Sequence, residues 1–300
     1  MMDEVWKKYF EPRTLERLRG LRLAARRAAE GAWSGAHRNP RSGRAIEFSE
    51  YRPYTTGDDL RQVDWKVYAR TNKFYLRRRE DETTLDCHFL VDASGSMGFA
   101  SEAAASNKLV CALRIAASLA FVAAENHDRA SLTSVGAAVT PRLPAGSGPG
   151  HLLAMATAMD AIELEPNVRI ASQLAAAAQS LPSRGLVVIL SDLFDDAESL
   201  LKTIRGIRQL AAEVLAIQVT DPAEAEFPFS ETTEFVGLED QLALTADSRG
   251  IAAAYREEFA RHRGELAAGC HAAEVTFWSL STSDPLHVRL PQLLQSAAAR

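Results

Sequence analysis

Residues 87–97 read Cys-His-Phe-Leu-Val-Asp-Ala-Ser-Gly-Ser-Met, an apolar run followed at once by small oxygen-bearing side chains. The run from Cys87 to Val91 has the length and composition of a buried strand. Asp92, Ser94 and Ser96 then fall in the turn that leaves this strand, where a tight turn can aim all three side chains at one point. The stretch therefore predicts a core strand with a polar site at its carboxyl end.

From residue 85 onward, short apolar strands alternate with helical stretches. The expected strands cover 85–91, 130–135, 139–143, 185–191, 214–219 and 274–280, and the expected helices cover 102–125, 151–162, 170–181, 197–212 and 250–268. Alternation of this type is typical of an α/β fold, in which a mostly parallel sheet carries helices on both faces. Ligands of such sheets bind beyond the carboxyl ends of the strands.

A second strand end carries similar chemistry. The apolar run Leu186–Leu190 is followed by Ser191 and Asp192, and we expect Asp192 to converge with Asp92 on one crevice. Asp192 also has a purely structural interpretation, because an acid just ahead of a helix can cap it or stand in its first turn. The two roles are compatible.

The spacing Asp92-x-Ser94-x-Ser96 itself has two interpretations. Hard divalent ions such as Mg²⁺ and Mn²⁺ take oxygen ligands and keep some waters, so converging carboxylate and hydroxyl oxygens suit them. Alternatively, the two serines only satisfy backbone groups in a strand-to-helix turn, as short hydroxyl side chains often do. We expect a metal site of Asp92, Ser94, Ser96 and Asp192, with a covered turn as the alternative.

The composition is that of a globular protein. The 300 residues are 47% hydrophobic, which is enough to bury a sizeable core in one large domain or two. The most apolar stretch, residues 109–124, is interrupted by polar residues and is shorter than the ~20 residues that span a bilayer. The N-terminus lacks the apolar core of a secretory signal, so we expect a cytoplasmic protein with reduced thiols at Cys87, Cys111 and Cys270.

The front of the chain is basic and the remainder is acidic. Residues 1–79 hold 19 lysines and arginines against 10 acids, whereas residues 80–300 hold 15 against 29. A basic segment can meet nucleic acid or anionic lipid. Its aromatic residues lie in alternating stretches that are typical of packing, so we favour attraction to the acidic remainder or to a protein partner and expect no nucleic acid.

The basic segment also sets the expected domain organisation. Residues 12–30 carry leucines at helical spacing among arginines, which predicts an amphipathic helix with a basic outer face. A glycine-containing loop follows at 30–43, and residues 45–51 and 74–79 alternate as strands do. We expect an N-terminal extension at 1–84, with a helix and a small β element, ahead of a main domain at 85–300.

Two stretches of the chain resemble known families. The spacing of Asp92, Ser94 and Ser96 resembles the metal-ion-dependent adhesion site of von Willebrand factor A domains, in which both serines bind the ion and the aspartate helps directly or through water. Residues 41–71 closely resemble the signature of the bacterial family called domain of unknown function 58. The main signature residues here are Arg44, Glu47, Arg52, Tyr54, Gly57, Asp58, Asp59, Arg61, Asp64, Trp65 and Arg70.

Resemblance to this family implies a von Willebrand A-like, Rossmann-like domain with an adaptor or chaperone-like role. Relatives are frequently encoded beside a MoxR-type AAA+ ATPase, which makes that ATPase or its client the expected partner. Many relatives also carry membrane helices, and we expect no membrane span in this chain. The charged signature either fastens the basic segment to the main domain through charge-assisted hydrogen bonds or faces a partner.

One position departs from the adhesion-site pattern. A complete site has a threonine on a second loop, and counting back from Leu174 and Gly185 places it at Val168, which has the shape of threonine without its oxygen. Asn167 can substitute as a ligand, or water can fill the gap. Weaker binding of the ion, or none, is the other consequence.

The leading functional hypothesis is a non-enzymatic protein-interaction or adaptor module. In it, Asp92, Ser94, Ser96 and Asp192 hold Mg²⁺ or Mn²⁺ and leave an open position for a carboxylate of the partner, in the assembly or maturation of a client. The alternative is a metal-dependent hydrolase in which Asp92 is a ligand or nucleophile and Asp192 orients water. It lacks the second acid of aspartate-nucleophile phosphatases, because Ser94 stands there, and His88 lies inside the strand.

Overall fold

A computed structural model describes residues 2–23, 50–54, 65–78, 84–181, 185–211, 213–240 and 242–298. The chain divides into two compact units. The larger unit consists of residues 1–30 and 84–300, and the smaller unit consists of residues 31–83. The chain therefore leaves the larger unit after its first helices and returns to it just before the strand that carries Asp92.

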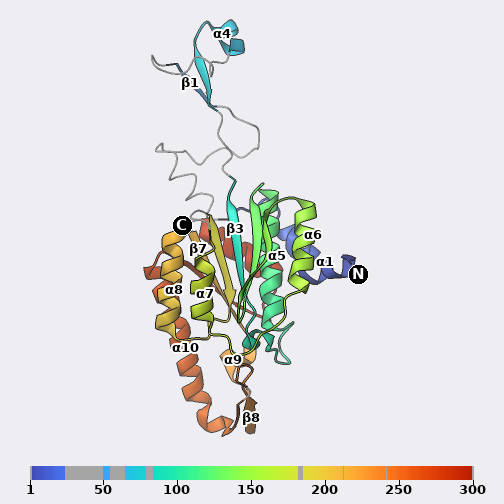
Figure 1. Cartoon of the computed structure of the whole chain (residues 1–300), viewed down its shortest axis with the longest axis vertical. Coiled ribbons are helices and arrows are strands. Elements are labelled where there is room, and N and C mark those ends of the chain that lie inside the picture. Colours follow the sequence, from blue (N-terminus) through green and yellow to red (C-terminus); the bar gives the residue numbers. More distant parts are fainter. Residues whose placement is uncertain are drawn as a thin grey trace. The chain divides into compact units, whose positions relative to one another are not determined.

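A six-stranded sheet forms the centre of the larger unit (Figure 1). Its strands are β3 (Asp86–Asp92), β4 (Arg129–Val135), β5 (Val139–Gly146), β6 (Leu186–Ser191), β7 (Glu213–Thr220) and β10 (Thr276–Ser281). They lie in the order β10-β7-β6-β3-β4-β5, and every neighbouring pair is parallel except β4 with β5. The predicted α/β class, a mostly parallel sheet with helices on both faces, is confirmed.

The central strands β3 and β6 consist of buried residues almost throughout. Unbroken apolar runs are what parallel strands need when helices cover both faces of the sheet. The two strands are direct neighbours, with Val91 opposite Leu190 in the register. Their carboxyl ends therefore lie side by side, as the strand pattern predicts.

Helices cover both faces of this sheet and create two apolar cores. Phe89 belongs to the first core and its neighbour Leu90 to the second, because successive side chains of a strand point to opposite faces. The first core contains residues of α5 (Lys108–Glu125), α6 (Pro149–Asp160) and α11 (Leu286–Ala298), and the second contains residues of α7 (Ile170–Ala178), α8 (Ala197–Leu210) and α10 (Ser248–Ala272).

The first residues of the chain pack on the larger unit. They form α1 (Met2–Tyr9) and α2 (Pro12–Leu18). The buried Tyr9 of α1, Leu18 of α2 and Phe10 between the two helices join the first core. The expected extension at 1–84 therefore needs correction, because its first helices belong with the main domain. The expected helix at 12–30 is also shorter, since it ends at Leu18 and Gly20 follows with a φ of 76°.

In its described residues, 50–54 and 65–78, the smaller unit contains an antiparallel pair of short strands and a helix. The strands are β1 (Glu50–Pro53) and β2 (Tyr75–Arg78), and the helix is α4 (Trp65–Thr71), which the sequence did not predict. The rings of Tyr68 and Phe74 stack with centroids 4.4 Å apart, and Trp65 meets both edge-on. These aromatic side chains pack on one another, as their alternating pattern suggested.

Most of the charged family signature lies outside the described residues. This applies to Arg44, Glu47, Gly57, Asp58, Asp59, Arg61 and Asp64. Arg52 lies in β1, Tyr54 follows it, and Trp65 and Arg70 lie on α4, where both are exposed.

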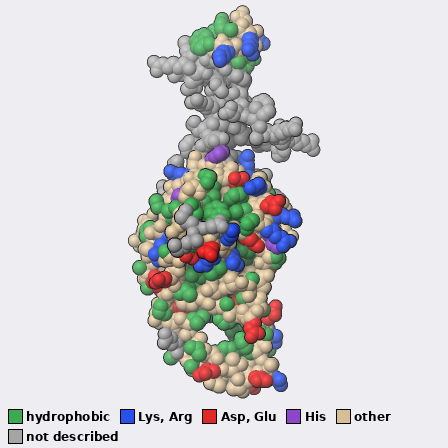
Figure 2. Space-filling view, turned by 90° about the vertical axis from the view of Figure 1, so that its right-hand side faces the viewer, with side chains coloured by type: hydrophobic (Ala, Val, Ile, Leu, Met, Phe, Trp, Pro, Cys, Tyr) green, Lys and Arg blue, Asp and Glu red, His purple; other side chains and the backbone are tan. Residues whose placement is uncertain are grey.

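A hairpin between β7 and α10 is an addition to the predicted fold. After β7 come the short helix α9 (Pro222–Glu226) and the antiparallel strands β8 (Thr232–Val236) and β9 (Ala243–Asp247), which contact α10. At the level of this hairpin the space-filling view shows an opening through the molecule (Figure 2). Within the described residues, no helix combines the length and apolar character needed to cross a membrane.

Candidate functional site at the carboxyl ends of β3 and β6

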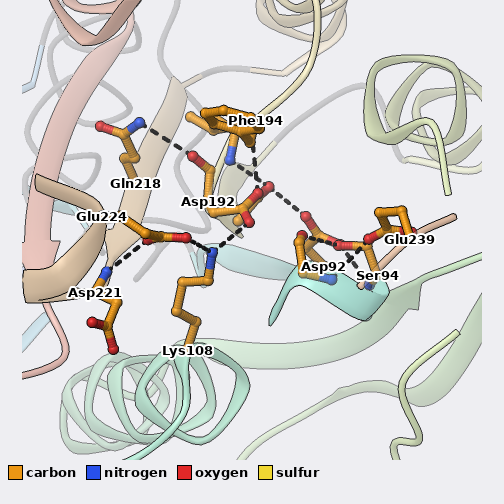
Figure 3. Close-up of polar contacts among 12 residues, drawn as sticks. Asp92, Ser94, Lys108, Asp192, Phe194, Gln218, Asp221, Glu224 and Glu239 are labelled. Atoms are coloured by element: carbon orange, nitrogen blue, oxygen red, sulfur yellow. Dashed lines mark hydrogen bonds and ion pairs between the residues drawn. The ribbon is translucent and has the colours of Figure 1, made fainter. Parts of the chain in front are cut away.

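Asp92 ends β3 with its carboxylate turned inward (Figure 3). One oxygen accepts a hydrogen bond from the backbone N–H of Ser94 at 2.8 Å, and the other accepts one from the hydroxyl of Ser191 at 2.5 Å. Only 1% of the residue is exposed. The carboxylate of Asp92 therefore ties the turn after β3 to the end of β6.

Burial, and then the nearby charge of Asp192, raise the pKa of Asp92 to about 7. Hydrogen bonds from Ser191 and Ser94 act in the opposite direction but are the smaller effects. The structure thus brings the two aspartates of the expected site close enough to interact. A cation placed beside them would favour the charged form of Asp92, because opposite charge stabilises a carboxylate.

Ser94 and Ser96 lie in the turn that follows, where residues Gly95–Gly98 form one 3₁₀ turn. Ser94 precedes this turn in an extended conformation, and its side chain caps no backbone N–H. Instead the two hydroxyl oxygens lie 3.0 Å apart and share a hydrogen bond. The covered-turn interpretation does not describe Ser94, because its hydroxyl faces another side chain rather than the backbone.

The two hydroxyl oxygens fit the geometry of a hard cation. Ligands that lie about 2.1 Å from an octahedral Mg²⁺ are about 3 Å apart along an edge, which matches the 3.0 Å between Ser94 and Ser96. No three His, Cys, Asp or Glu side chains of the described residues cluster as in a metal site. A cation here would therefore depend on the serine hydroxyls, with Asp92 beside them.

Asp192 lies at the same edge of the sheet, but its carboxylate forms an ion pair with a buried lysine. The ammonium of Lys108, which is 1% exposed, lies 2.8 Å from Asp192 and 2.5 Å from Glu224. The other oxygen of Asp192 accepts the N–H of Phe194 at 3.2 Å. Asp192 therefore has hydrogen-bond donors on both oxygens, so its suitability as a direct metal ligand is lower than the sequence suggested.

Lys108 keeps its charge in this position. Burial by itself lowers the pKa of Lys108, but the charges of Asp192 and Glu224 and their hydrogen bonds outweigh burial, and the pKa is raised. The residue is the first of α5, because Asn107 caps the helix by accepting the N–H of Val110. The helix thus begins at Lys108 rather than at residue 102, which brings the ammonium to the edge of the sheet.

A carboxylate that the sequence did not identify also reaches the site. Glu239, from the segment between β8 and β9, accepts the N–H of Ser96 at 2.8 Å and the N–H of Val168 at 3.1 Å. Val168 therefore lies beside the turn of Ser96, in the region where the family pattern places a threonine. Asn167 is exposed and left-handed with a φ of 59°, and it is Glu239 that brings oxygens to this place.

Large apolar side chains lie around the polar centre that Asp92, Ser94 and Ser96 form. Phe194, two residues after Asp192, is 64% exposed, and Leu164 and Leu238 beside the serine turn are also exposed. Next to Phe194 is a pocket of about 330 Å³. Its lining residues are Phe194, Asp195, Tyr255, Glu258, Phe259 and His262. Exposed apolar groups around a polar centre are typical of protein-binding surfaces.

His88 lies away from this centre, as expected. Its ring lies 2.8 Å from the hydroxyl of Ser131 on β4, and burial lowers the pKa of His88. The residue is buried within β3, four positions before Asp92. It therefore packs in the sheet and does not stand beside either aspartate as a base.

Comparison with known proteins identifies the family. A family model described as "Protein of unknown function DUF58" matches residues 50–265. The uncharacterized protein Rv1480 of Mycobacterium tuberculosis is 32% identical over 272 residues, which cover 88% of this chain and 81% of that protein, and Mb1516 of Mycobacterium bovis gives the same values.

The solved structures that match the chain are more distant in sequence. The conserved hypothetical protein BatB from Bacteroides thetaiotaomicron is 13% identical with a TM-score of 0.47, covering 72% of this chain and 100% of that one. The SpRpn10 VWA domain is also 13% identical, with a TM-score of 0.41, covering 71% of this chain and 95% of that one. The match of this model confirms the family that the sequence resembles. This chain belongs to the family described as Protein of unknown function DUF58.

Proposed function

We propose that the chain is a non-enzymatic protein-interaction module whose binding surface is the edge formed by the carboxyl ends of β3 and β6. The observation that carries this proposal is the arrangement of Asp92, Ser94 and Ser96, a small polar centre with exposed Phe194 and Leu238 around it. Polar groups that fix orientation, with apolar groups that supply contact area, are what a protein partner needs.

A divalent cation, Mg²⁺ or Mn²⁺, completes this centre in the proposal. The hydroxyls of Ser94 and Ser96 would hold it, with Asp92 beside them and Asp192 acting through water, since Lys108 already occupies Asp192. When bound, the ion supplies a positive charge that attracts a carboxylate of the partner. The donor set is oxygen only, which suits a hard cation.

The partner that the family resemblance implies is a MoxR-type AAA+ ATPase or its client. A role in the assembly or maturation of a client fits an adaptor that presents one exposed edge. The hydrolase alternative is less well supported, because both oxygens of Asp92 are engaged and the residue is buried, so a substrate cannot approach it as a nucleophile. Catalysis also needs a base, and His88 lies elsewhere.

The proposal predicts that the chain retains a MoxR-type AAA+ ATPase of the same genome in a Mg²⁺-dependent manner. A chelator should reduce retention about tenfold or more, and Ser96→Ala should do the same, because each removes the cation or one of its ligands. The measurement is a pull-down with both proteins purified, with Ser180→Ala as a control at an exposed serine after α7.

Two outcomes of this pull-down count against the proposal. Retention that neither the chelator nor Ser96→Ala changes would remove the cation from the binding surface. No retention of the ATPase in any condition would remove that partner.

A further inference from the structure

The carboxylate of Glu239 spans two loops of the site. One oxygen binds the N–H of Ser96, in the turn after β3, and the other binds the N–H of Val168, two residues before α7. The serine and the valine are 143 and 71 residues away from Glu239 in the chain. Paired backbone N–H groups form a cradle for a carboxylate, and the nearby start of α7 adds to the positive potential.

The segment that carries Glu239 lies directly on the serine turn. The carbonyl group of Leu238 is so close to Gly95 that a side chain at Gly95 would collide with backbone. Glycine at this position thus permits a close approach of two chain segments, in addition to the two hydrogen bonds of Glu239. The segment covers the polar centre instead of leaving it open.

The hairpin that supports this segment is weakly attached. Most residues of β8 and β9 are exposed, including Val236 and Leu244, and Leu242 just before β9 is exposed as well. Its inward aromatic residue is Phe235, whose ring stacks on Phe227 at 5.7 Å. Figure 2 shows an opening at the level of the hairpin, so the hairpin contacts the rest of the unit over a limited area. A two-stranded hairpin with so little burial has low local stability.

We infer that Glu239 is an internal ligand, which holds the place of a carboxylate that an acidic segment of a protein partner brings to the site. The inference rests on the proposed function, because it takes this edge as the binding surface. Binding of the partner displaces Glu239 from the N–H groups of Ser96 and Val168. The hairpin then leaves the edge, and the partner's carboxylate occupies the same cradle.

The direct test removes the carboxylate of Glu239 and then offers a free carboxylate to the N–H groups of Ser96 and Val168. In ¹⁵N-resolved NMR spectra, Glu239→Ala should shift the amide signals of Ser96 and Val168, and titration with acetate should then shift them back in a saturable way. The wild-type signals should not respond to the same acetate concentrations, because Glu239 is already bound. Glu239→Gln, which keeps the size of the side chain, should respond as Glu239→Ala does but less strongly.

Glu234→Ala is the matched control, since Glu234 is an exposed acid of β8 in the same hairpin. It should leave both amide signals as in the wild type. Hydrogen exchange of residues 232–247 should be at least about tenfold faster in Glu239→Ala and unchanged in Glu234→Ala, because the hairpin loses its contact with the edge. Unshifted Ser96 and Val168 signals in Glu239→Ala, or an equal acetate response in the wild type, would overturn the inference.

Partner affinity separates this inference from the proposed function. The cradle is available to the partner only in the fraction of molecules where Glu239 has left, so Glu239→Ala should bind the AAA+ ATPase about tenfold more tightly. Unchanged affinity despite freed amide groups would overturn the role of Glu239 as a competitor. Absence of binding in both wild type and variant, with the predicted NMR response intact, would instead count against the proposed function.

Discussion

Lys108→Met is expected to lower the free energy of unfolding by about 3–5 kcal/mol, the usual cost of removing one partner from a buried ion pair. The ammonium is almost fully buried between Asp192 and Glu224. Methionine fills a similar volume, so the loss comes from the two carboxylates left without their cation and not from a cavity. The measurement is urea unfolding monitored by circular dichroism.

The control for this experiment is Lys202→Met, at an exposed lysine of α8, which should change stability by less than about 0.5 kcal/mol. The raised pKa of Lys108 also determines how its contribution to the free energy of unfolding changes with pH. Because the pKa of Lys108 is raised above 10.5, its stabilisation is fully present at neutral pH and is lost only as the pH rises past that range. Equal free energies of unfolding for Lys108→Met and Lys202→Met at neutral pH would contradict a stabilising role for the buried contacts of Lys108.

Phe194→Ala is expected to weaken binding of the AAA+ ATPase about 30-fold, which corresponds to the ~2 kcal/mol of an aromatic anchor at an interface. The side chain is 64% exposed and follows Asp192 closely, so it offers apolar area next to the polar centre. Stability of the free chain should stay within about 0.5 kcal/mol of the wild type, because little of the ring is buried. Titration calorimetry with the purified ATPase measures the effect.

Leu210→Ala provides a comparison at an exposed apolar residue at the end of α8, outside the site. It should leave the affinity unchanged. If Phe194→Ala and Leu210→Ala bound the ATPase equally well, the surface around Phe194 would not be the interface. The pair therefore tests the location of the binding surface independently of any cation.

The sheet and the meeting of Asp92 with Asp192 could be predicted because their signals are local. β3 and β6 are unbroken apolar runs, and such runs are buried whatever their neighbours are. The rule that ligands bind at the carboxyl ends of parallel strands then placed both aspartates at one edge. The spacing of Ser94 and Ser96 alone predicted that their side chains lie close together.

Glu239 could not be predicted in this way. Its partners are backbone N–H groups of Ser96 and Val168, and backbone groups leave no trace in the pattern of side chains. The hairpin around it is largely exposed, so its strands lack the apolar alternation that marks a half-buried strand. Only the folded chain shows that this segment reaches the site.

The sequence carried a weaker indication that Lys108 has a buried partner. Lys108 is the first residue of the long, mostly apolar helix α5, and a charged residue in that position needs a buried partner or an exit to solvent. The identity of the partners was not accessible, because Asp192 and Glu224 come from elements 84 and 116 residues away. The pairing depends on tertiary structure that strand and helix patterns do not specify.

The most direct test of the central claim is anomalous diffraction from crystals soaked in MnCl₂. The account predicts one manganese peak in contact with the hydroxyl oxygens of Ser94 and Ser96, and its loss in the double variant Ser94→Ala/Ser96→Ala. A map without a peak beside these oxygens, or a peak that survives the double substitution, would contradict the proposed cation site.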